Sequence, residues 1–472
     1  MNRGVACAGL AITLMMTPAF ARKADLESLA RGLDAQRIQS VEFDASGRYW
    51  QFTQAPAPDE PWPPFEVREY VATLDFARAA VHARYQRTQV QEPRRERPPA
   101  QATMNQYSRD GMSWNLTPAP SAIPANLAER NAELWASPQG FLRAAISNRA
   151  QATWRGQIAR VEFAMGPFHF AGDVAANGDV LAVRSFLDST VLGDTPIEFR
   201  YSNYRDFGGV RFPGRIQRFV GGFPWYDLTV SAVRVNAAPE FSVPPEISAD
   251  PVPAVSAVDV SDLAPGVKLF GGGTHNTVIV EQVKGLVVIE APLNEERSRA
   301  ILAKLREIYP GRAIQAVINT HAHFDHAGGL RAFVAAGVPV ITHERNARYY
   351  AKAWAAPRTI NPDALAASKR KPRFVTLSDF LRVEDAANPI ELHRIAGSGH
   401  NDAFLMAYLP AARLLVEADA WTPVVGAAPA PVNPLWRNLF ENVTRLKLDV
   451  VRVAPLHGTP RGFAELRDAV AR

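Results

Sequence analysis

Four side chains able to bind a metal ion lie within the hexapeptide His321-Ala322-His323-Phe324-Asp325-His326. It follows a run of β-branched residues and precedes a pair of glycines, which places it just beyond the end of a strand. Imidazole nitrogens and carboxylate oxygens suit Zn²⁺ where no thiolate is available. His321 and His323 point the same way from an extended backbone, whereas Asp325 lies beyond a turn and can face a second centre. The hexapeptide therefore predicts one metal site and is compatible with two.

Residues 1–21 are typical of a secretory signal peptide. Arg3 precedes the apolar stretch Gly4–Met16, and small residues offer a cleavage site after Ala21. A spanning helix needs about 20 consecutive apolar residues, so we expect no transmembrane segment in the mature chain. The only cysteine, Cys7, lies in this leader, which excludes disulfides and thiolate zinc ligands from the mature protein. We expect a periplasmic or secreted protein.

A proline-rich stretch divides the 472 residues into two domains. Six prolines lie within residues 237–265, with few large apolar side chains to bury, and this composition favours an extended linker. The sequence therefore predicts an N-terminal domain over residues 22–236 and a C-terminal domain over residues 266–472.

The N-terminal domain shows segments of alternating polarity separated by turn signals such as Asn177-Gly178, and a helix is expected over Leu127–Ser147. This pattern predicts an α+β domain with a curved antiparallel sheet and helices on one face. The phrase Tyr-x-x-Tyr…Gly-Gly-Val-x-Phe-Pro within Tyr201–Pro213 resembles the half-barrel of periplasmic lipoprotein carriers. We expect no active-site residue in this half of the chain.

A cluster of basic residues between the first strands is compatible with a nucleic-acid surface or with a solvated loop. Its members are Arg84, Arg87, Arg94, Arg95 and Arg97. The cluster shows no interleaved aromatic stacking pattern, and the net charge of the chain is only +5. We therefore favour a solvated loop and expect no nucleic-acid partner.

In the C-terminal domain, pairs of strands alternate with helices, which predicts an α/β fold with two sheets between helical layers, an αββα sandwich. Candidate ligands follow the strands of this domain. The hexapeptide follows the strand Ala316–Ile318, and three further candidates occur in the same setting at His400, Asp419 and His457. Each side chain thus lies in a loop whose start is fixed by a rigid strand, which suits a preorganised metal site.

With these residues in this order, residues 266–472 resemble the metallo-β-lactamase superfamily of zinc hydrolases, which carries the motif His-x-His-x-Asp-His. The resemblance implies two Zn²⁺ ions. The first would be bound by His321, His323 and His400. The second would be bound by Asp325, His326 and His457, with Asp419 bridging both. Glu417 is a rival to Asp419, but its offset of two residues places it within the strand.

Three positions refine this resemblance. Asp419 stands where the β-lactamases of the superfamily usually have Cys or Ser, which favours the thioesterase, lactonase, phosphodiesterase and sulfatase branches. His323 stands where the diiron branch has Glu, which favours zinc over iron. Glu290 replaces a common Asp and so bears on how the ligands are oriented. His275, after Gly271-Gly272-Gly273, lies either in a simple hairpin turn or in a loop that touches substrate.

The resemblance implies an exported, zinc-dependent enzyme that hydrolyses a small molecule. A metal-bridging hydroxide would attack an ester, lactone, thioester, sulfate or amide, and Asp325 would be the catalytic residue that orients it and moves a proton. Two alternatives stay open, a nuclease of the same superfamily and a carrier or binding protein for an apolar ligand with an accessory zinc domain. The sequence leaves the substrate, the role of the N-terminal domain and the oligomeric state undetermined.

Overall fold

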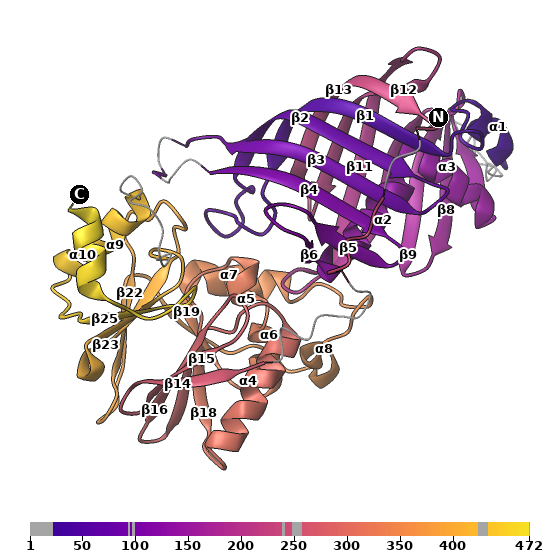
Figure 1. Cartoon of the computed structure of the whole chain (residues 1–472). Helices are drawn as coiled ribbons and strands as arrows, with labels where there is room; N and C mark the ends of the chain where they lie inside the picture. Colours follow the sequence, from indigo (N-terminus) through magenta and orange to yellow (C-terminus); the bar gives the residue numbers. More distant parts are fainter. Residues whose placement is uncertain are drawn as a thin grey trace, which may run out of the picture.

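The computed structural model describes residues 22–92, 95–96, 100–237, 241–247, 257–422 and 433–471. It shows a large curved sheet beside a domain built from two smaller sheets (Figure 1). The expected signal peptide, residues 1–21, and part of the expected linker lie outside the described residues. Within the described ranges, every helix is too short or too polar to cross a membrane.

The N-terminal sheet has thirteen strands, each antiparallel to its neighbours, in the order β6-β5-β4-β3-β2-β1-β13-β12-β11-β10-β9-β8-β7. The strands are β1 (Ser40–Trp50), β2 (Pro64–Asp75), β3 (Ala80–Gln89), β4 (Gln101–Arg109), β5 (Met112–Asn115), β6 (Ser121–Ala122), β7 (Gln151–Arg155), β8 (Ile158–Met165), β9 (Phe168–Ala175), β10 (Val180–Ser189), β11 (Gly193–Asp206), β12 (Arg211–Val220) and β13 (Phe223–Val235). The first and last strands meet in the middle, where Val41 pairs with Val235.

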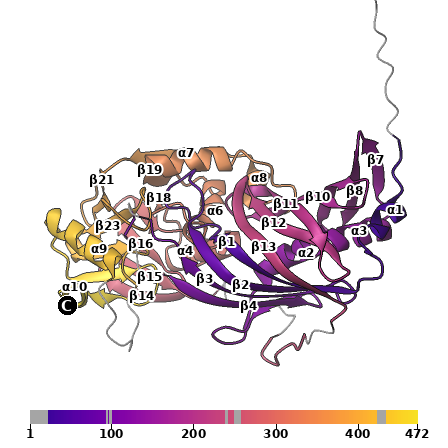
Figure 2. The ribbon, with the colours of Figure 1, turned by 90° about the horizontal axis from the view of Figure 1, so that it is seen from above.

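Helices pack against one face of this sheet, which curves around them (Figure 2). They are α1 (Leu26–Arg31), α2 (Leu127–Ala136) and α3 (Pro138–Ser147). The single helix expected over Leu127–Ser147 is divided at Pro138, which starts a helix readily but cannot continue one. Phe141 of α3 is fully buried, and a Cβ at Gly172 of β9 would lie 2.2 Å from its Cζ. The predicted curved sheet with helices on one face is thereby confirmed.

The basic cluster differs from the loop that we expected. Arg84 and Arg87 lie within β3, on opposite faces of the strand. Arg95 forms ion pairs with Glu60 at 2.9 Å and with Asp402 of the C-terminal domain at 3.1 Å. Arg94 and Arg97 lie outside the described residues. The prediction of a loop was wrong for Arg84 and Arg87, because the segment Ala80–Gln89 alternates between buried and more exposed side chains and forms a strand.

The C-terminal domain has two sheets. The first contains β14 (Asp259–Ala264), β15 (Val267–Gly271), β16 (Thr277–Gln282), β17 (Gly285–Ile289), β18 (Ile314–Ile318), β19 (Val340–His343) and β20 (Phe374–Leu377), in chain order. The second contains β21 (Phe380–Val383), β22 (Ile390–Arg394), β23 (Leu405–Leu409), β24 (Leu414–Glu417), β25 (Arg452–Pro455) and β26 (Arg461–Gly462), also in chain order. The strands β17 to β20 are parallel, as are β24 and β25.

Helices cover the outer faces of both sheets. They are α4 (Glu295–Ile308), α5 (Phe324–Ala327), α6 (Leu330–Ala335), α7 (Glu344–Ala353), α8 (Ala364–Ser368), α9 (Pro434–Arg445) and α10 (Phe463–Val470). In β16, Val278 and Val280 pack between the sheets, whereas Ile279 faces the helical layer. Burial on both faces explains the continuous apolar runs of the central strands. The predicted αββα sandwich is confirmed.

The start of this domain differs from the predicted boundary. Residues 259–264, assigned above to the linker, form the edge strand β14, in which Val260 pairs with Phe270. Four of its six residues are exposed, so the segment lacks the apolar pattern that identifies a strand.

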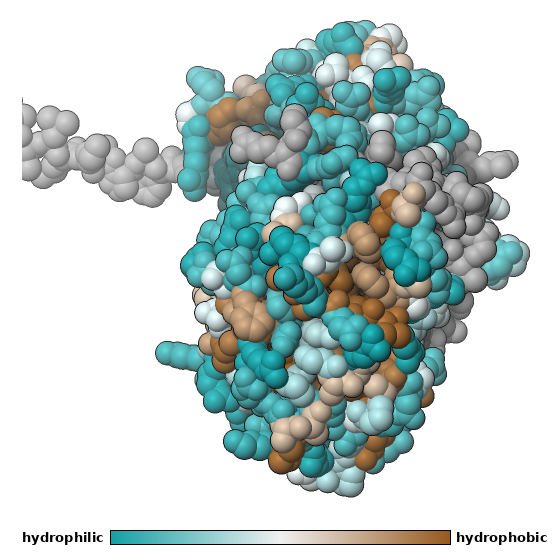
Figure 3. Space-filling model, turned by 90° about the vertical axis from the view of Figure 1, so that its left-hand side faces the viewer, coloured by the Kyte–Doolittle hydropathy of each residue, from teal (hydrophilic) through white to brown (hydrophobic). Residues whose placement is uncertain are grey.

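On the face of the molecule shown in Figure 3, most of the surface is hydrophilic, and hydrophobic side chains gather near its centre.

Candidate metal centre

The hexapeptide lies at the carboxyl end of β18, between the two domains of the chain. The strand ends at Ile318, the backbone stays extended through the first two histidines, and α5 then carries Asp325 and His326 on a single turn. The glycines that follow allow close packing, because a Cβ at Gly328 would lie 1.9 Å from the carbonyl oxygen of Leu293. The two halves of the hexapeptide therefore face different neighbours.

The first half joins a cluster of four potential ligands. Its members are His321, His323, His400 and Asp419, whose ligand atoms all lie within 4.8 Å of one another. Asp419 Oδ2 lies 3.1 Å from Nε2 of His321 and 3.2 Å from Nε2 of His400. Three imidazoles and a carboxylate at this spacing match the donor set of a zinc site.

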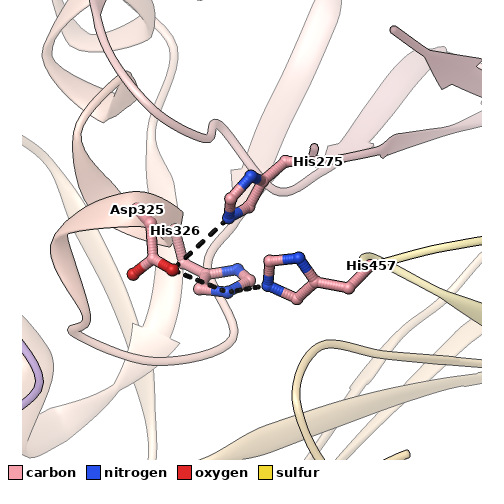
Figure 4. A group of neighbouring side chains, drawn as sticks. All are labelled: His275, Asp325, His326 and His457. Atoms are coloured by element: carbon pink, nitrogen blue, oxygen red, sulfur yellow. Dashed lines mark hydrogen bonds and ion pairs between the residues drawn. The ribbon is translucent and has the colours of Figure 1, made fainter. Parts of the chain in front are cut away.

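The second half joins another cluster of four. It contains His275, Asp325, His326 and His457, again with all ligand atoms within 4.8 Å of one another (Figure 4). The Nε2 atoms of His326 and His457 are 3.0 Å apart, and Nε2 of His275 lies 3.4 Å from Asp325 Oδ2. The loop after β15 thus brings His275 among the ligands of this cluster.

Asp419 lies between the two clusters. Besides its contacts in the first cluster, its Oδ2 is 3.0 Å from His326 Nε2 and its Oδ1 is 2.9 Å from His457 Nε2. Glu417 lies elsewhere, because its Oε2 accepts hydrogen bonds from the backbone N–H groups of Ala420 and Trp421. The structure thus places Asp419, rather than Glu417, in the bridging position.

Glu290 accepts hydrogen bonds that orient two of the histidines. This fully buried carboxylate accepts hydrogen bonds from Thr320 Oγ1 at 2.5 Å and, through Oε2, from His326 Nδ1 at 3.1 Å. Because Thr320 donates to Glu290, its oxygen is free to accept from His321 Nδ1, 3.0 Å away. Both histidines therefore carry their proton on Nδ1 and present the Nε2 lone pair to the centre.

The hydrogen bond at Nδ1 also determines the tautomer of His457, and this tautomer shows whether the residues fit a metal. The Nδ1–H of His457 donates to the carbonyl oxygen of Thr274 at 3.1 Å. The Nε2 lone pairs of His326 and His457 therefore face each other across 3.0 Å, next to the carboxylate of Asp419. Such a concentration of electron pairs in a buried site is unfavourable without a cation, so the donor set fits a metal.

The pKa values of the ligands follow from burial and charge. Burial lowers the pKa of His321 to about 4 and that of His323 well below its usual value, so both rings are neutral, as a metal ligand must be. Burial also opposes the charged form of His326, but Asp419 and Glu290 outweigh it and raise the pKa of His326 well above its usual value. A proton and a metal ion would thus compete for the same lone pair.

The N-terminal domain reaches into this centre through residues 51–63, the β1–β2 loop. The Nε2–H of His323 donates to the carbonyl oxygen of Ala55 at 2.9 Å, and Asn401 Nδ2 donates to the same oxygen at 3.1 Å. His323 Nδ1 is buried and has no hydrogen-bond partner among the described residues. Ala55 therefore fixes the ring so that the other nitrogen, Nδ1, is available to a metal.

A second contact from the same loop reaches the carboxylate predicted to be catalytic. Gln54 Nε2 donates to Asp325 Oδ1 at 3.1 Å, while Oδ2 of the same carboxylate faces His275. Phe52 and Trp62 pack edge-on against Phe324 of α5, with ring centroids 5.6 and 6.1 Å apart. Our expectation that the N-terminal half contributes nothing to the site was wrong, because residues nearly 270 positions apart meet here and no local pattern announces the contact.

We predict that Gln54→Ala lowers kcat/KM by about 2- to 10-fold, the equivalent of one hydrogen bond, with little change in thermal stability. The reason is that Asp325 would lose the donor that fixes one of its oxygens. Steady-state kinetics would measure the effect. Asp59→Asn is the control, because Asp59 lies in the same loop but pairs with Lys352 at an exposed site. Equal effects of the two substitutions would contradict the assignment.

The structure brings together all seven residues proposed as ligands, and it adds two that the motif left undecided. His275 lies in the second cluster, and Glu290 forms a third group of possible ligands with His321 and His326, in which its Oε2 contacts His326 Nδ1. The glycines before His275 were a signal for a loop at the site, but they did not distinguish it from a hairpin turn.

An αββα domain with two adjoining histidine and carboxylate clusters at its strand ends has the donor groups of a metal-binding protein. Residues 270–423 match the family model of the metallo-beta-lactamase superfamily, and the C-terminal domain belongs to that superfamily.

Individual proteins show more limited similarity. A segment of 56 residues is 36% identical to the linear primary-alkylsulfatase of Pseudomonas sp. (strain ATCC 19151), covering 12% of this chain and about a tenth (10%) of the relative. The metallo-beta-lactamase from Pontibacter korlensis is 18% identical, with a TM-score of 0.36 over 46% of this chain and 98% of that one. The metallo-beta-lactamase from Hirschia baltica is 20% identical, with a TM-score of 0.34 over 45% and 96%.

Proposed function

We propose that this chain is an exported hydrolase that binds two zinc ions and cleaves a small-molecule ester, lactone, thioester, sulfate or amide. One observation carries the proposal. The ligand atoms of two clusters converge on Asp419, and the hydrogen bonds behind the rings leave lone pairs facing inward. Membership of the C-terminal domain in a superfamily that includes hydrolases supports the reaction class.

The candidate ligands form two groups, one for each zinc ion. His321, His323 and His400 would hold one zinc ion, and Asp325, His326 and His457 would hold the other, with His275 beside them and Asp419 between the two. Together the two ions would supply an activated water and a Lewis acid at the scissile group. Asp325 would orient that water and move its proton, and its own orientation is supported by Gln54 at one oxygen and His275 at the other.

Sulfate esters are the first substrate class to test. The segment similar to a linear primary-alkylsulfatase supports this choice, as does the carboxylate at position 419. The leader over residues 1–21 supports export, which fractionation of cells expressing the tagged full-length chain would test.

The proposal predicts close to two zinc ions per chain and hydrolysis that stops when the metal is removed. Plasma emission spectrometry of the purified protein measures the first. For the second, a panel of primary alkyl sulfate, lactone, thioester, phosphodiester and β-lactam substrates is assayed before and after chelation, and again after zinc is restored. Undiminished activity of metal-free protein would refute the mechanism, and turnover of the phosphodiester alone would favour a nuclease.

A further inference from the structure

The inner face of the N-terminal sheet bears a cavity that is separate from the metal centre. It has a volume of about 260 Å³ and lies between α2 and the inner face of strands β1 to β4, β12 and β13. One part of its wall is formed by aromatic side chains and a methionine: Tyr49, Phe52, Tyr70, Tyr85, Met104 and Trp225.

The polar part of the wall is rich in guanidinium groups. Three arginines line the cavity, Arg87, Arg130 and Arg218, against two carboxylates, Glu129 and Glu133. Arg218 Nη1 donates to Glu129 at 3.1 Å, and Arg130 Nη1 donates to Glu133 at 3.3 Å. The remaining positive charge has no counter-ion among the described residues that line the cavity.

Arg218 occupies a position that otherwise belongs to the core. Its neighbours on the same face of β12 are Ile216 and Val220, both buried, and Arg218 itself is only 1% exposed. Its Cζ lies 3.9 Å from the centre of the Trp225 ring. Burying an arginine at a core position is unfavourable unless its charge is used.

Several N–H groups of these arginines have no protein acceptor. Within the described part of the chain, no hydrogen-bond partner is found for Nε and Nη2 of Arg218, Nε of Arg130 or Nε of Arg87. Buried donors are paired in nearly all native proteins, and the exceptions call for a specific explanation. An anion in the cavity would balance the excess positive charge of its lining, since a guanidinium fork matches the oxygens of a carboxylate or sulfate.

We propose that this cavity binds a small amphiphilic organic anion, with its oxyanion head on Arg87, Arg130 and Arg218 and its apolar body on the aromatic wall. The cavity is slightly smaller than the roughly 300 Å³ at which pockets for drug-sized ligands begin, so the body is a short alkyl chain or a single ring. This refines the alternative of a carrier for an apolar ligand, because the ligand is charged. It goes beyond the proposed function and does not depend on the metal centre.

The cavity adjoins the metal centre through the β1–β2 loop. Phe52 and Thr53 of the loop line the cavity, and the next two residues, Gln54 and Ala55, contact the ligands of the metal. The ring of Phe52 stacks on Trp225 at 5.0 Å on one side and meets Phe324 at 5.6 Å on the other. One short segment therefore forms a wall of both sites.

Binding of octane-1-sulfonate to the zinc-loaded full-length protein tests the proposal. This anion cannot be hydrolysed as an ester, so calorimetry reports binding alone. We expect one site per chain that persists after chelation of the metal, with about tenfold weaker binding at this site in Arg87→Gln, which loses a charge-assisted hydrogen bond to the anion. Arg84→Gln is the matched control, because Arg84 lies on the same strand but faces outward, and it should bind as the parent protein does.

Three further measurements separate the proposal from simpler explanations. Met104→Trp fills the cavity without changing its charge and should abolish binding, whereas inorganic sulfate and octan-1-ol, each offering half of the ligand, should bind far more weakly than the sulfonate. Equal affinities of the Arg87 and Arg84 variants, no binding to the parent protein, or tight binding of the uncharged alcohol would each overturn it. Chelator-treated protein should bind the sulfonate equally well, so failure of the metal chemistry would leave this result intact.

Discussion

Replacing Asp419 by asparagine is expected to lower turnover by about 10²- to 10³-fold or more, and to reduce the zinc content below two ions per chain. The carboxylate lies within 3.2 Å of ring nitrogens of four histidines, two from each cluster. The asparagine amide would present donor hydrogens to one cluster and remove the negative charge that both share. Loss of one preorganised electrostatic group typically has an effect of this size.

Glu417→Gln provides the matched control for this prediction. Glu417 lies two residues earlier and is also fully buried, but its Oε2 accepts only from the backbone of Ala420 and Trp421 among the described residues. A glutamine oxygen can accept the same hydrogen bonds, so we expect zinc content and turnover close to those of the parent protein. Loss of zinc from the Glu417 variant, with zinc retained by the Asp419 variant, would reverse the assignment.

Much of the metal centre could be predicted because its determinants are local in the sequence. The hexapeptide follows a buried strand, and the period-two geometry of an extended backbone already separates His321 from Asp325. His400, Asp419 and His457 also follow strand ends, where α/β folds gather their ligands. Because these residues all follow the ends of strands, the order of strands in the sequence is enough to predict that they lie close together.

The contribution of the N-terminal domain could not be predicted, because it depends on contacts between distant segments. Ala55 acts through its carbonyl oxygen, which every residue type possesses, so its identity gives no signal. The cavity poses the same difficulty. Arg87 and Arg218 look like surface residues until the register of β3 and β12 shows that they face inward. Long-range packing decides both features, and a sequence pattern records only the neighbours along the chain.

Glu290→Gln should produce the second large effect, a fall in zinc affinity of about 10- to 100-fold with a smaller loss of stability. Glu290 accepts hydrogen bonds from Asn319, Thr320 and His326. Glutamine has a single acceptor oxygen, so its amide N–H would face at least one of these donors. If it faces His326, Nδ1 must accept and the proton moves to Nε2, the atom that points at the metal, which gives the wrong tautomer for a ligand.

Competition with a fluorescent zinc chelator would measure the affinity of the Glu290 variant, and thermal unfolding of the metal-free form would measure its stability separately. Glu281→Gln is the control, because Glu281 lies on the adjacent strand β16 and accepts from Tyr309 rather than from a ligand. An unchanged zinc affinity in the Glu290 variant would show that Asn319 and Thr320 position the histidines without it. A loss of stability with full zinc affinity would assign the buried carboxylate to folding alone, and the tautomer argument would then fail.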